Sequence, residues 1–458
     1  MRKSLYILFG LILIFGQTLF GNIINIPDDY PTIQEGLNMA NTGDTVLVAA
    51  GTYYENIIWP ETNEIKLIGS GEDNCIIDGN SLARVIYFGQ DLNGIIDSST
   101  LITGFTIQNG NSPCGGGIFF YNSEPNLVNL RITDNSAVSS GGGIMCFNYS
   151  DVNFENVIFT NNSAGSEGGA LCCDFSSDAT LTNVIITDNE SISGCGGGIS
   201  SEGGSIVVVS YSLITGNSAV YGGGVFCGEK GGCNLINCTI VNNSASDDGG
   251  GVGSYYYSWE VVNCILWNNF PNQITGDVGI SYSNIQGGCA GIGNIDADPL
   301  FIDPLNGDYH LSWANFPIPD STMSPCIDAG DPTSPQDPDG TIAYMGAFYF
   351  DQTIVATDYN NPNNIVSSGL FQNYPNPFKN STTISFSLKE QSKVKLSIYN
   401  IKGELVATLI NEEMYPHNNH QIIWNGKSGN NDLANGIYFY KLSIGNTVVD
   451  IKKCLLLK

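Results

Sequence analysis

Side chains that could act as general bases or bind anionic groups are scarce in the long central part of the chain. Between residues 22 and 350 there are 36 acidic side chains and only four basic ones, which are Lys66, Arg84, Arg131 and Lys230. Elimination on an acidic sugar needs a basic side chain to remove the proton, commonly beside Ca²⁺ held by carboxylates. The composition therefore weighs against this reaction. The same negative charge disfavours nucleic acid and anionic lipid as partners.

Carboxylates offer two other kinds of chemistry. Hydrolysis of a glycosidic bond asks for two carboxyl groups about 5 to 9.5 Å apart, and so many acids will form such pairs by chance. Aspartates also gather among proline and glycine near the end of this region, where their oxygens could hold Ca²⁺; they include Asp296, Asp298, Asp303, Asp308, Asp328, Asp331, Asp337 and Asp339. We favour the interpretation that they form turns in a cap at the distal end of this region. We assign no catalytic, cofactor-binding or metal-binding residue and expect no cofactor.

Both ends of the chain differ from this acidic body. Residues 1–21 begin with Arg2 and Lys3 and continue as an apolar stretch, which is typical of a secretory signal peptide. No later stretch approaches about 18 uninterrupted apolar residues. Beyond residue 350 the charge is nearly balanced, with ten basic and eight acidic residues, which predicts a domain boundary. Residues 351–369, rich in Asn, Ser and Asp, are expected to form a linker.

An internal repeat determines which secondary-structure elements could position the acidic and basic side chains. Glycine runs begin at Gly115, Gly141, Gly168, Gly196, Gly222 and Gly249, and a second marker keeps the same interval at Asn135, Asn162, Asn189, Asn217, Asn243 and Asn269. Two markers with one period of about 27 residues indicate a repeated unit that stacks on itself. No two of the four basic residues occupy one column of neighbouring repeats.

Apolar columns accompany the markers and predict the kind of repeat. One column is Ile118, Ile144, Leu171, Ile199, Val225 and Val252, and another is Ile132, Phe159, Ile186, Ile214, Ile240 and Leu266. The short, β-branched runs bounded by Gly, Asn and Ser favour strands. We therefore predict an all-β fold in which residues 22–350 form a right-handed parallel β-helix. The same period over the whole region would give about a dozen coils, with asparagine and glycine at the corners.

The thirteen cysteines follow the repeat as well. Cys146, Cys173 and Cys227 occupy the position of Phe120, and Cys238 and Cys264 occupy that of Leu130, Val157 and Val184. Cysteine that alternates with Phe, Leu and Val is interpreted as a small buried hydrophobe. The pairs Cys146 with Cys173 and Cys238 with Cys264 would still be close enough for disulfides if the strands lie about 4.8 Å apart.

Two resemblances concern the β-helix. The stretch DDYPTIQEGLNMANTGDTVLVAAGTYYENI after residue 27 includes a short helix expected near residues 32–40, which would cap the open core. It resembles the start of pectin-lyase-like β-helix proteins, including pectin methylesterases. The repeats look like those of bacterial surface proteins of the polymorphic outer-membrane type. A methylesterase would need two aspartates and an arginine on one face; Asp134 and Asp188 share a phase, but they look like members of a polar turn column.

The last part of the chain has its own signature. Its alternating pattern of apolar and polar residues predicts short strands that form a small immunoglobulin-like β-sandwich over residues 370–458. Its most distinctive stretches are YPNPF at 374–378, VKLSIYNIKGELV at 394–406, NGIYFYKL at 435–442 and KKCLLLK at 452–458. This segment resembles the C-terminal sorting domain of the type IX secretion system. The resemblance implies recognition by that secretion machinery and a secreted or cell-surface location, with attachment to the outer-membrane surface of a Gram-negative bacterium as one outcome.

Two functions remain open from the sequence. The first is a non-catalytic scaffold whose long face serves adhesion or contact with a neutral glycan. The second is a polysaccharide-degrading enzyme, a glycoside hydrolase or lyase, built on the same β-helix. Aromatic residues that could stack on neutral sugars are Tyr53, Tyr54, Trp59, Tyr255, Tyr256, Tyr257 and Trp259.

Overall fold

A computed structural model describes residues 21–89, 96–255, 259–352 and 369–456, except 374, 377, 380, 389, 390, 415, 416, 430 and 446. The chain divides into two compact units, Met1–Gln352 and Thr353–Lys458. Apart from Gly21, the expected signal peptide lies outside the described residues, as do residues 353–368 of the expected linker. Within the described residues, no helix has the length and apolar character needed to cross a membrane.

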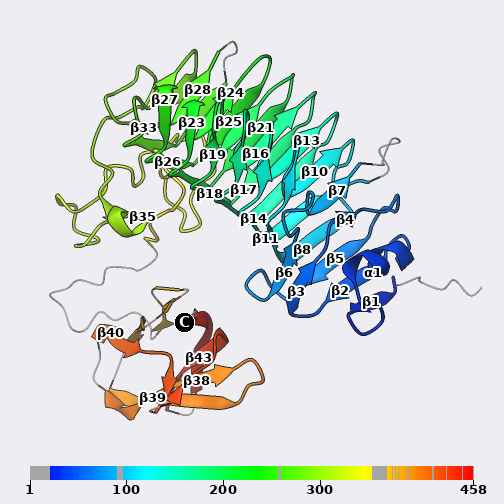
Figure 1. The fold of residues 1–458 in the computed structure, drawn as a ribbon. Coiled ribbons are helices and arrows are strands. Elements are labelled where there is room, and N and C mark those ends of the chain that lie inside the picture. Colours follow the sequence, from blue (N-terminus) through cyan, green and yellow to red (C-terminus); the bar gives the residue numbers. More distant parts are fainter. Residues whose placement is uncertain are drawn as a thin grey trace, which may run out of the picture. The chain divides into compact units, whose positions relative to one another are not determined.

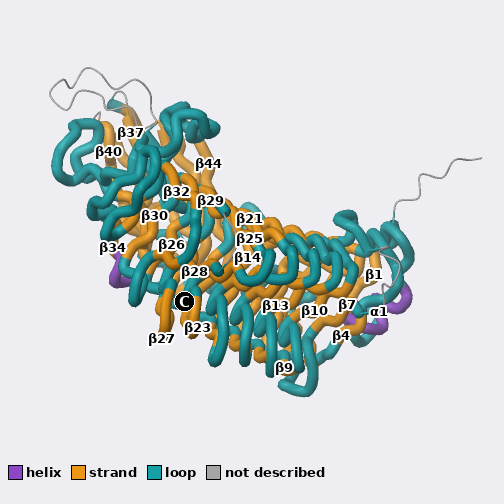
Figure 2. The backbone as a smooth tube through the Cα atoms, turned by 90° about the horizontal axis from the view of Figure 1, so that it is seen from above, coloured by secondary structure: helices purple, strands orange, loops and turns teal. Residues whose placement is uncertain are grey.

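The first unit is a parallel β-helix, in which successive coils stack their strands side by side (Figures 1 and 2). Sheet A contains β1 (Ile23–Ile26), β2 (Thr45–Val48), β3 (Gly51–Tyr54), β5 (Lys66–Gly69), β6 (Cys75–Asp78), β8 (Leu101–Gln108), β11 (Asn126–Thr133), β14 (Val152–Thr160), β17 (Ala179–Thr182), β18 (Ile185–Thr187), β21 (Ile206–Ser210), β22 (Leu213–Thr215), β25 (Gly232–Ile236), β26 (Thr239–Val241), β29 (Glu260–Val262), β30 (Ile265–Trp267), β32 (Gly279–Ser281) and β33 (Asn284–Ile285). Sheet B contains β4 (Ile57–Ile58), β7 (Ile86–Phe88), β10 (Ile118–Tyr121), β13 (Ile144–Phe147), β16 (Leu171–Asp174), β20 (Ile199–Ser201), β24 (Val225–Cys227), β28 (Val252–Ser254) and β31 (Ile274–Thr275). Sheet C contains β9 (Asn111–Ser112), β12 (Ser136–Ala137), β15 (Ser163–Ala164), β19 (Glu190–Ser191), β23 (Ser218–Tyr221) and β27 (Ser244–Asp248).

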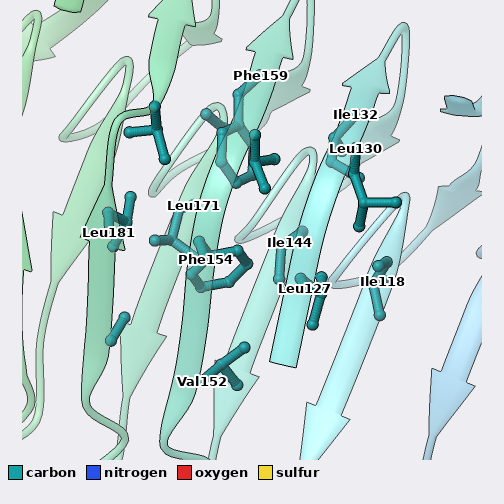
Figure 3. Packing of buried hydrophobic residues seen from close by; sticks show 14 of the residues in the cluster. Ile118, Leu127, Leu130, Ile132, Ile144, Val152, Phe154, Phe159, Leu171 and Leu181 are labelled. Carbon is teal, nitrogen blue, oxygen red and sulfur yellow. The ribbon is translucent and has the colours of Figure 1, made fainter. Parts of the chain in front are cut away.

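The predicted apolar columns are ladders of the interior. In sheet B, Ile118 pairs with Ile144, which pairs with Leu171 in the next coil. In sheet A, Ile132 pairs with Phe159 in the same manner. These side chains are fully buried and point into the space between the sheets (Figure 3). Each buried aliphatic side chain contributes about 1.5–3 kcal/mol relative to an exposed one, so repetition of the column supplies much of the stability.

The asparagine marker is a buried hydrogen-bond ladder. Asn189 Nδ2 donates to Asn217 Oδ1 at 2.9 Å and to the carbonyl of Phe159 at 3.1 Å. Its Oδ1 accepts the backbone N–H and the Nδ2 of Asn162, at 3.0 and 2.9 Å. Every polar atom of the amide therefore has a partner, which allows a polar side chain to stay in the core without a large desolvation cost. At the end of the ladder, Gln273 Oε1 accepts from Asn269 Nδ2 at 2.7 Å.

The glycine runs serve two purposes. The first glycine of each run has a positive φ, between 61° and 70°, which residues with a Cβ adopt at a cost. The second lies where another coil's backbone passes close by. A Cβ on Gly142 would lie 2.4 Å from the carbonyl oxygen of Gly169 and 2.5 Å from that of Ser163. Corner geometry was predicted, and the close packing of neighbouring backbones is an additional reason for glycine.

The cysteines are present as thiols. Cys146, Cys173 and Cys227 point into the core from sheet B, and Cys238 and Cys264 are buried at a corner of sheet A. Cys238 N–H donates to Cys264 Sγ at 3.3 Å, so these thiols also satisfy backbone groups, as the serines do at the same position in other coils.

A short helix covers the amino-terminal end of the core, as predicted. Helix α1 (Ile33–Met39) begins after Thr32, whose hydroxyl accepts from Glu35 N–H at 3.2 Å. Its side chains Ile33 and Leu37 are fully buried. The carboxylate of Glu55 accepts from the backbone N–H of Ile33 at 2.8 Å, which suits the positive end of a helix.

The expectation of about a dozen coils is wrong. In the described residues sheet B has nine strands, one in each complete coil, and β1 and β32 extend sheet A by a partial turn at either end; the coiling ends near Ile285. The following residues 296–352, here called the return segment, were expected to cap the distal end. They instead pack against the outer face of β22, β26 and β30, with β34 (Phe301–Asp303), the 3₁₀ turn η1 (Pro304–Asn306) and β35 (Asp308–Leu311). The Asn237 side chain donates to the Tyr344 carbonyl at 2.8 Å, and Ala347 N–H donates to Thr239 Oγ1 at 2.9 Å.

The second unit contains two antiparallel sheets around one core, in agreement with the predicted β-sandwich. The first sheet is β36 (Gly369–Leu370), β37 (Thr382–Leu388) and β40 (His417–Trp424), and the second is β39 (Leu405–Met414), β38 (Ser392–Asn400), β43 (Gly436–Ile444) and β44 (Thr447–Leu456). A small hairpin pairs β41 (Lys427–Ser428) with β42 (Asn431–Asp432). Ile384 and Phe386 of the first sheet share a buried cluster with Leu396 and Tyr440 of the second. The Tyr440 hydroxyl donates to the Phe371 carbonyl at 2.9 Å.

Candidate functional site

The outer face of sheet B carries a row of aromatic side chains on consecutive coils. Because side chains alternate along a strand, the residues between the buried Ile118, Phe120, Ile144 and Cys146 point outward. The outward residues and the corner that follows them form what we call the aromatic strip, which consists of Tyr87, Phe119, Tyr121, Phe147, Tyr149 and Phe175.

The rings of the strip touch from coil to coil. Ring centroids are 5.8 Å apart for Tyr87 and Phe119, 6.3 Å for Phe119 and Phe147, and 4.7 Å for Phe147 and Phe175. These spacings lie within the range of favourable aromatic pairs. Tyr121 pairs with Phe147 in the parallel ladder, so the row of rings runs along the axis of the β-helix. The rings of Tyr87, Phe119, Tyr121, Phe147 and Phe175 therefore form one connected surface rather than a set of independent side chains.

Two members of the strip are exposed at strained corners. Tyr149 has a φ of 63° and Phe175 a φ of 55°, a left-handed conformation that is unfavourable for large side chains. Their side chains are 62% and 57% exposed, so burial of the rings does not offset this cost. Phe175 keeps its contact with Phe147, and backbone strain at a large, exposed side chain supports a hypothesis of function at the surface.

The cation of Arg84 packs against the strip. The Arg84 guanidinium lies 4.6 Å from the ring centroids of both Tyr87 and Phe119, an arrangement that stabilises the charge and orients the rings. Burial lowers the pKa of Arg84 from its ordinary value. Its charge is directed at aromatic faces, so it offers little to an anionic ligand.

Three carboxylates follow the strip along the same face. They are Glu167, Asp174 and Glu202, and they surround the outward but buried Cys172, whose pKa is raised by burial and then by these acids. Glu202 accepts hydrogen bonds from Ser200 Oγ at 3.3 Å and from Glu229 N–H at 3.0 Å. Burial, with Glu167 and Asp174 nearby, raises the pKa of Glu202 to about 7.

This face can do two things chemically. Flat, partly exposed rings in a row can stack on the apolar faces of sugars, and since the Arg84 cation is directed at the rings, neutral sugars are favoured. A carboxyl group with a pKa near 7 beside other carboxylates is the arrangement used for general acid catalysis of glycoside hydrolysis. The rings form an extended surface, whereas the acids are confined to its end.

The four basic residues considered from the sequence do not meet. Lys66 on β5 and Lys230 at a turn are both exposed, and Arg84 is engaged with the strip. Arg131 lies on β11, where Nη2 is 3.4 Å from Glu72 Oε1 and 3.7 Å from Asp73 Oδ1. None of the four lies beside another in one column, as their spacing in the sequence predicted.

Asp134 and Asp188 belong to a turn column, as the sequence indicated. Both have a positive φ, as do the residues at the same corner in other coils, Asn109, Asn161, Gly216, Asn242 and Asn268. Each accepts a hydrogen bond from the threonine before it, at 2.7 Å from Thr133 and 2.9 Å from Thr187. These bonds satisfy the aspartates within the corner.

The aspartates of the return segment mostly form turns. Asp331 Oδ1 accepts from Thr333 N–H at 2.8 Å, and Asp339 Oδ1 accepts from Thr341 N–H at 3.0 Å. Asp308 accepts from His310 N–H at 3.1 Å. In the described part of the chain, no three His, Cys, Asp or Glu side chains lie in an arrangement that could hold a metal ion.

Asp337 gives the return segment a pH dependence. Burial, with Asp339 and Asp328 nearby, raises its pKa from 3.8 to about 7. Because the folded state prefers the protonated form, its contribution to stability is complete below about pH 4 and is lost as the pH rises through about 7. We expect the melting temperature of Asp337→Asn, relative to that of the unmodified protein, to increase as the pH is raised from 5 to 8. Thermal unfolding at each pH measures this difference. The exposed Asp277→Asn is the control, and an equal change in both variants would contradict the assignment.

The aromatic residues considered from the sequence are mostly elsewhere. Trp59 and Trp259 are 2% and 3% exposed and belong to the core, whereas Tyr54 and Tyr255 are exposed. Tyr256 and Tyr257 lie outside the described residues, and Tyr53 is half-buried against the core. Sequence reasoning missed the strip, although Tyr121 and Phe147 occupy the same outward position one period apart.

Comparisons with known families concern two parts of the chain. Residues 372–456 match the family model described as a secretion system C-terminal sorting domain. Residues 156–174 match the model of the Chlamydia polymorphic membrane protein repeat, a stretch that runs from within β14 through Asn162 and Gly168 to β16. No curated protein matched the chain. The second unit is thus a type IX sorting domain, and the β-helix is the cargo of a protein that is secreted or displayed at the cell surface.

Proposed function

Starting from this exported β-helix, we propose that the protein is a non-catalytic surface or secreted scaffold that contacts a neutral glycan through the aromatic strip. The observation that carries the proposal is the pair of exposed rings, Tyr149 and Phe175, which are held at strained corners beside a row of rings that Phe175 joins through Phe147. Sorting through residues 370–458 would bring the strip to the outside of the cell, where attachment to the outer-membrane surface would present it to glycans.

The charge distribution supports a neutral ligand. The formal net charge of the chain is −28, and only four basic residues lie between residues 22 and 350. An acidic polysaccharide would be repelled over most of this surface. Stacking of sugar faces on aromatic rings needs no charge, so a neutral chain lying along the axis of the β-helix meets no such penalty.

Removal of the two exposed rings tests the proposal. The double variant Tyr149→Ser and Phe175→Ser should keep its fold, because both side chains are largely exposed. We expect retention of the full chain in gels containing neutral polysaccharides to weaken by at least about tenfold, which corresponds to about 1.4 kcal/mol. Affinity electrophoresis of both proteins on a panel of neutral and acidic polysaccharides provides the measurement.

The matched control is Tyr54→Ser, which removes a ring of similar or greater exposure from a different part of the β-helix. It should bind as the unmodified protein does. Unchanged retention of the double variant, or preferential retention on acidic polysaccharides, would contradict the proposal.

A second function, glycoside hydrolysis, is favoured by one observation, the raised pKa of Glu202 at the end of the strip. In this alternative Glu202 is the general acid and Glu167 is the second carboxylate. Activity would fall as the pH rises through about 7, because the acid must be protonated.

Glu202→Gln distinguishes the alternatives. If the protein is an enzyme, the substitution should lower product release from the retained polysaccharide by at least about a hundredfold while retention persists. Reducing-end analysis of the same incubations measures this, with Glu229→Gln as the control on a neighbouring corner. Retention without any product from the unmodified protein would exclude hydrolysis of that polysaccharide.

A further inference from the structure

A cavity of about 400 Å³ lies between the coils of the β-helix and the return segment, away from the aromatic strip. Strands β26 and β30 and the corners after them form one wall, and β34, η1 and the start of β35 form the other. The lining residues are Val241, Asn242, Trp267, Asn268, Asp298, Leu300, Phe301, Pro304, Leu305 and Tyr309. The volume is within the range of small-molecule sites.

Three aromatic side chains form the walls of this cavity. Phe301 and Tyr309 have ring centroids 5.3 Å apart and planes at 83° to each other, so they make two perpendicular faces. Trp267 comes from the opposite wall and packs in the same apolar cluster. Tyr309 is 6% exposed, and its hydroxyl accepts from Asn242 Nδ2 at 2.7 Å. Its ring is therefore fixed in position.

The polar groups that line the cavity are mainly acceptors. Asn268 Nδ2 already donates to Asn242 Oδ1, which leaves the side-chain oxygen of Asn268, Oδ1, to accept from a ligand. Asp298 is the only charged residue of the lining. One of its oxygens accepts from Leu300 N–H at 3.0 Å, and the other remains for a ligand. Leu300 holds a φ of 51°, an unfavourable conformation at the edge of the cavity.

We propose that this cavity binds a quaternary ammonium group. Perpendicular aromatic faces attract a cation through their negative centres, and Asp298 supplies the opposite charge. The apolar side chains Val241, Leu300 and Leu305 suit N-methyl groups. A primary ammonium is strongly hydrated and would need several acceptors to replace its water, whereas the lining offers few.

Other small ligands fit the lining less well. An anion would meet Asp298 and no cation among the lining residues. A hexose carries hydroxyl groups on every side, and most of the wall would leave them without partners. The acidic body also raises the local concentration of cations.

The test uses choline as the probe and its neutral carbon isostere, 3,3-dimethylbutan-1-ol, as the matched ligand. We expect the full chain to bind choline at least about tenfold more tightly than the isostere, because cation–π and ion-pair contacts together are worth about 1.4 kcal/mol or more. Methyl glucoside should bind more weakly than choline. Isothermal titration at low salt measures all three, and vesicles of phosphatidylcholine show whether the group is also accepted on a lipid.

Two variants assign the interaction to the cavity. Asp298→Asn should reduce the affinity for choline by about fivefold to tenfold and leave that for the isostere unchanged, and Trp267→Leu should weaken both. Asp303→Asn, outside the lining, is the control for Asp298, and circular dichroism checks each fold. Equal affinity for choline and the isostere, stronger binding of methyl glucoside, or binding of neither choline nor the vesicles would overturn the proposal.

Discussion

Asn189→Ala is expected to destabilise the β-helix by about 3–5 kcal/mol. The substitution leaves the backbone N–H of Asn162 without a partner in a buried position and removes the hydrogen bonds that the Asn189 amide makes with the Phe159 carbonyl and with Asn162 Nδ2. A buried polar group left unsatisfied costs about 1–3 kcal/mol. Denaturant unfolding of the full chain, followed by circular dichroism, measures the loss.

Asn153→Ala is the matched control, because Asn153 Nδ2 donates to Asn126 Oδ1 at 3.1 Å in an exposed ladder. Water replaces that bond, so the cost should be below about 1 kcal/mol. Similar losses for the two variants would mean that the buried ladder contributes no more than its exposed counterpart.

Gly142→Ala should be at least as damaging, with a loss of about 3 kcal/mol or more. The added Cβ would lie 2.4 Å from the Gly169 oxygen and 2.5 Å from the Ser163 oxygen. Both are backbone atoms of another coil, which cannot move aside as a flexible side chain can. Relief requires separation of the coils, which weakens the adjoining ladder bonds. Expression of folded protein and its unfolding midpoint are the measurements.

Gly232→Ala is the control for this effect, since a Cβ at Gly232 would meet nothing within 4 Å. Its stability should change by less than about 0.5 kcal/mol or increase slightly. A stable Gly142→Ala protein would show that the runs of glycine are needed for their φ angles alone.

Much of the fold could be predicted because the repeat places equivalent residues in equivalent environments. The column of Ile118 and the ladder of Asn135 follow from spacing alone, and the structure confirms both. The return segment could not be predicted in this way. The path of this segment depends on apolar residues on the outside of the coils, such as Val241. A periodic pattern places Val241 in a strand but does not predict what packs against its outer face.

Sites on this scaffold are harder to infer than the scaffold itself. Tyr149 and Phe175 follow strands rather than belonging to them, and their exposure depends on the corner conformation. The raised pKa of Glu202 depends on burial and on acids from other coils. Such properties arise when distant residues meet, and the period of a repeat does not report them.

The most direct test of the glycan-contact account is amide hydrogen exchange of the full chain with and without the neutral polysaccharide that retains it. Binding along the strip should slow exchange at the corners, residues 147–150 and 174–177, while residues 204–206 on the same side of a later coil stay unchanged. Protection confined to other faces, or no protection at these corners at saturating polysaccharide, would contradict the account.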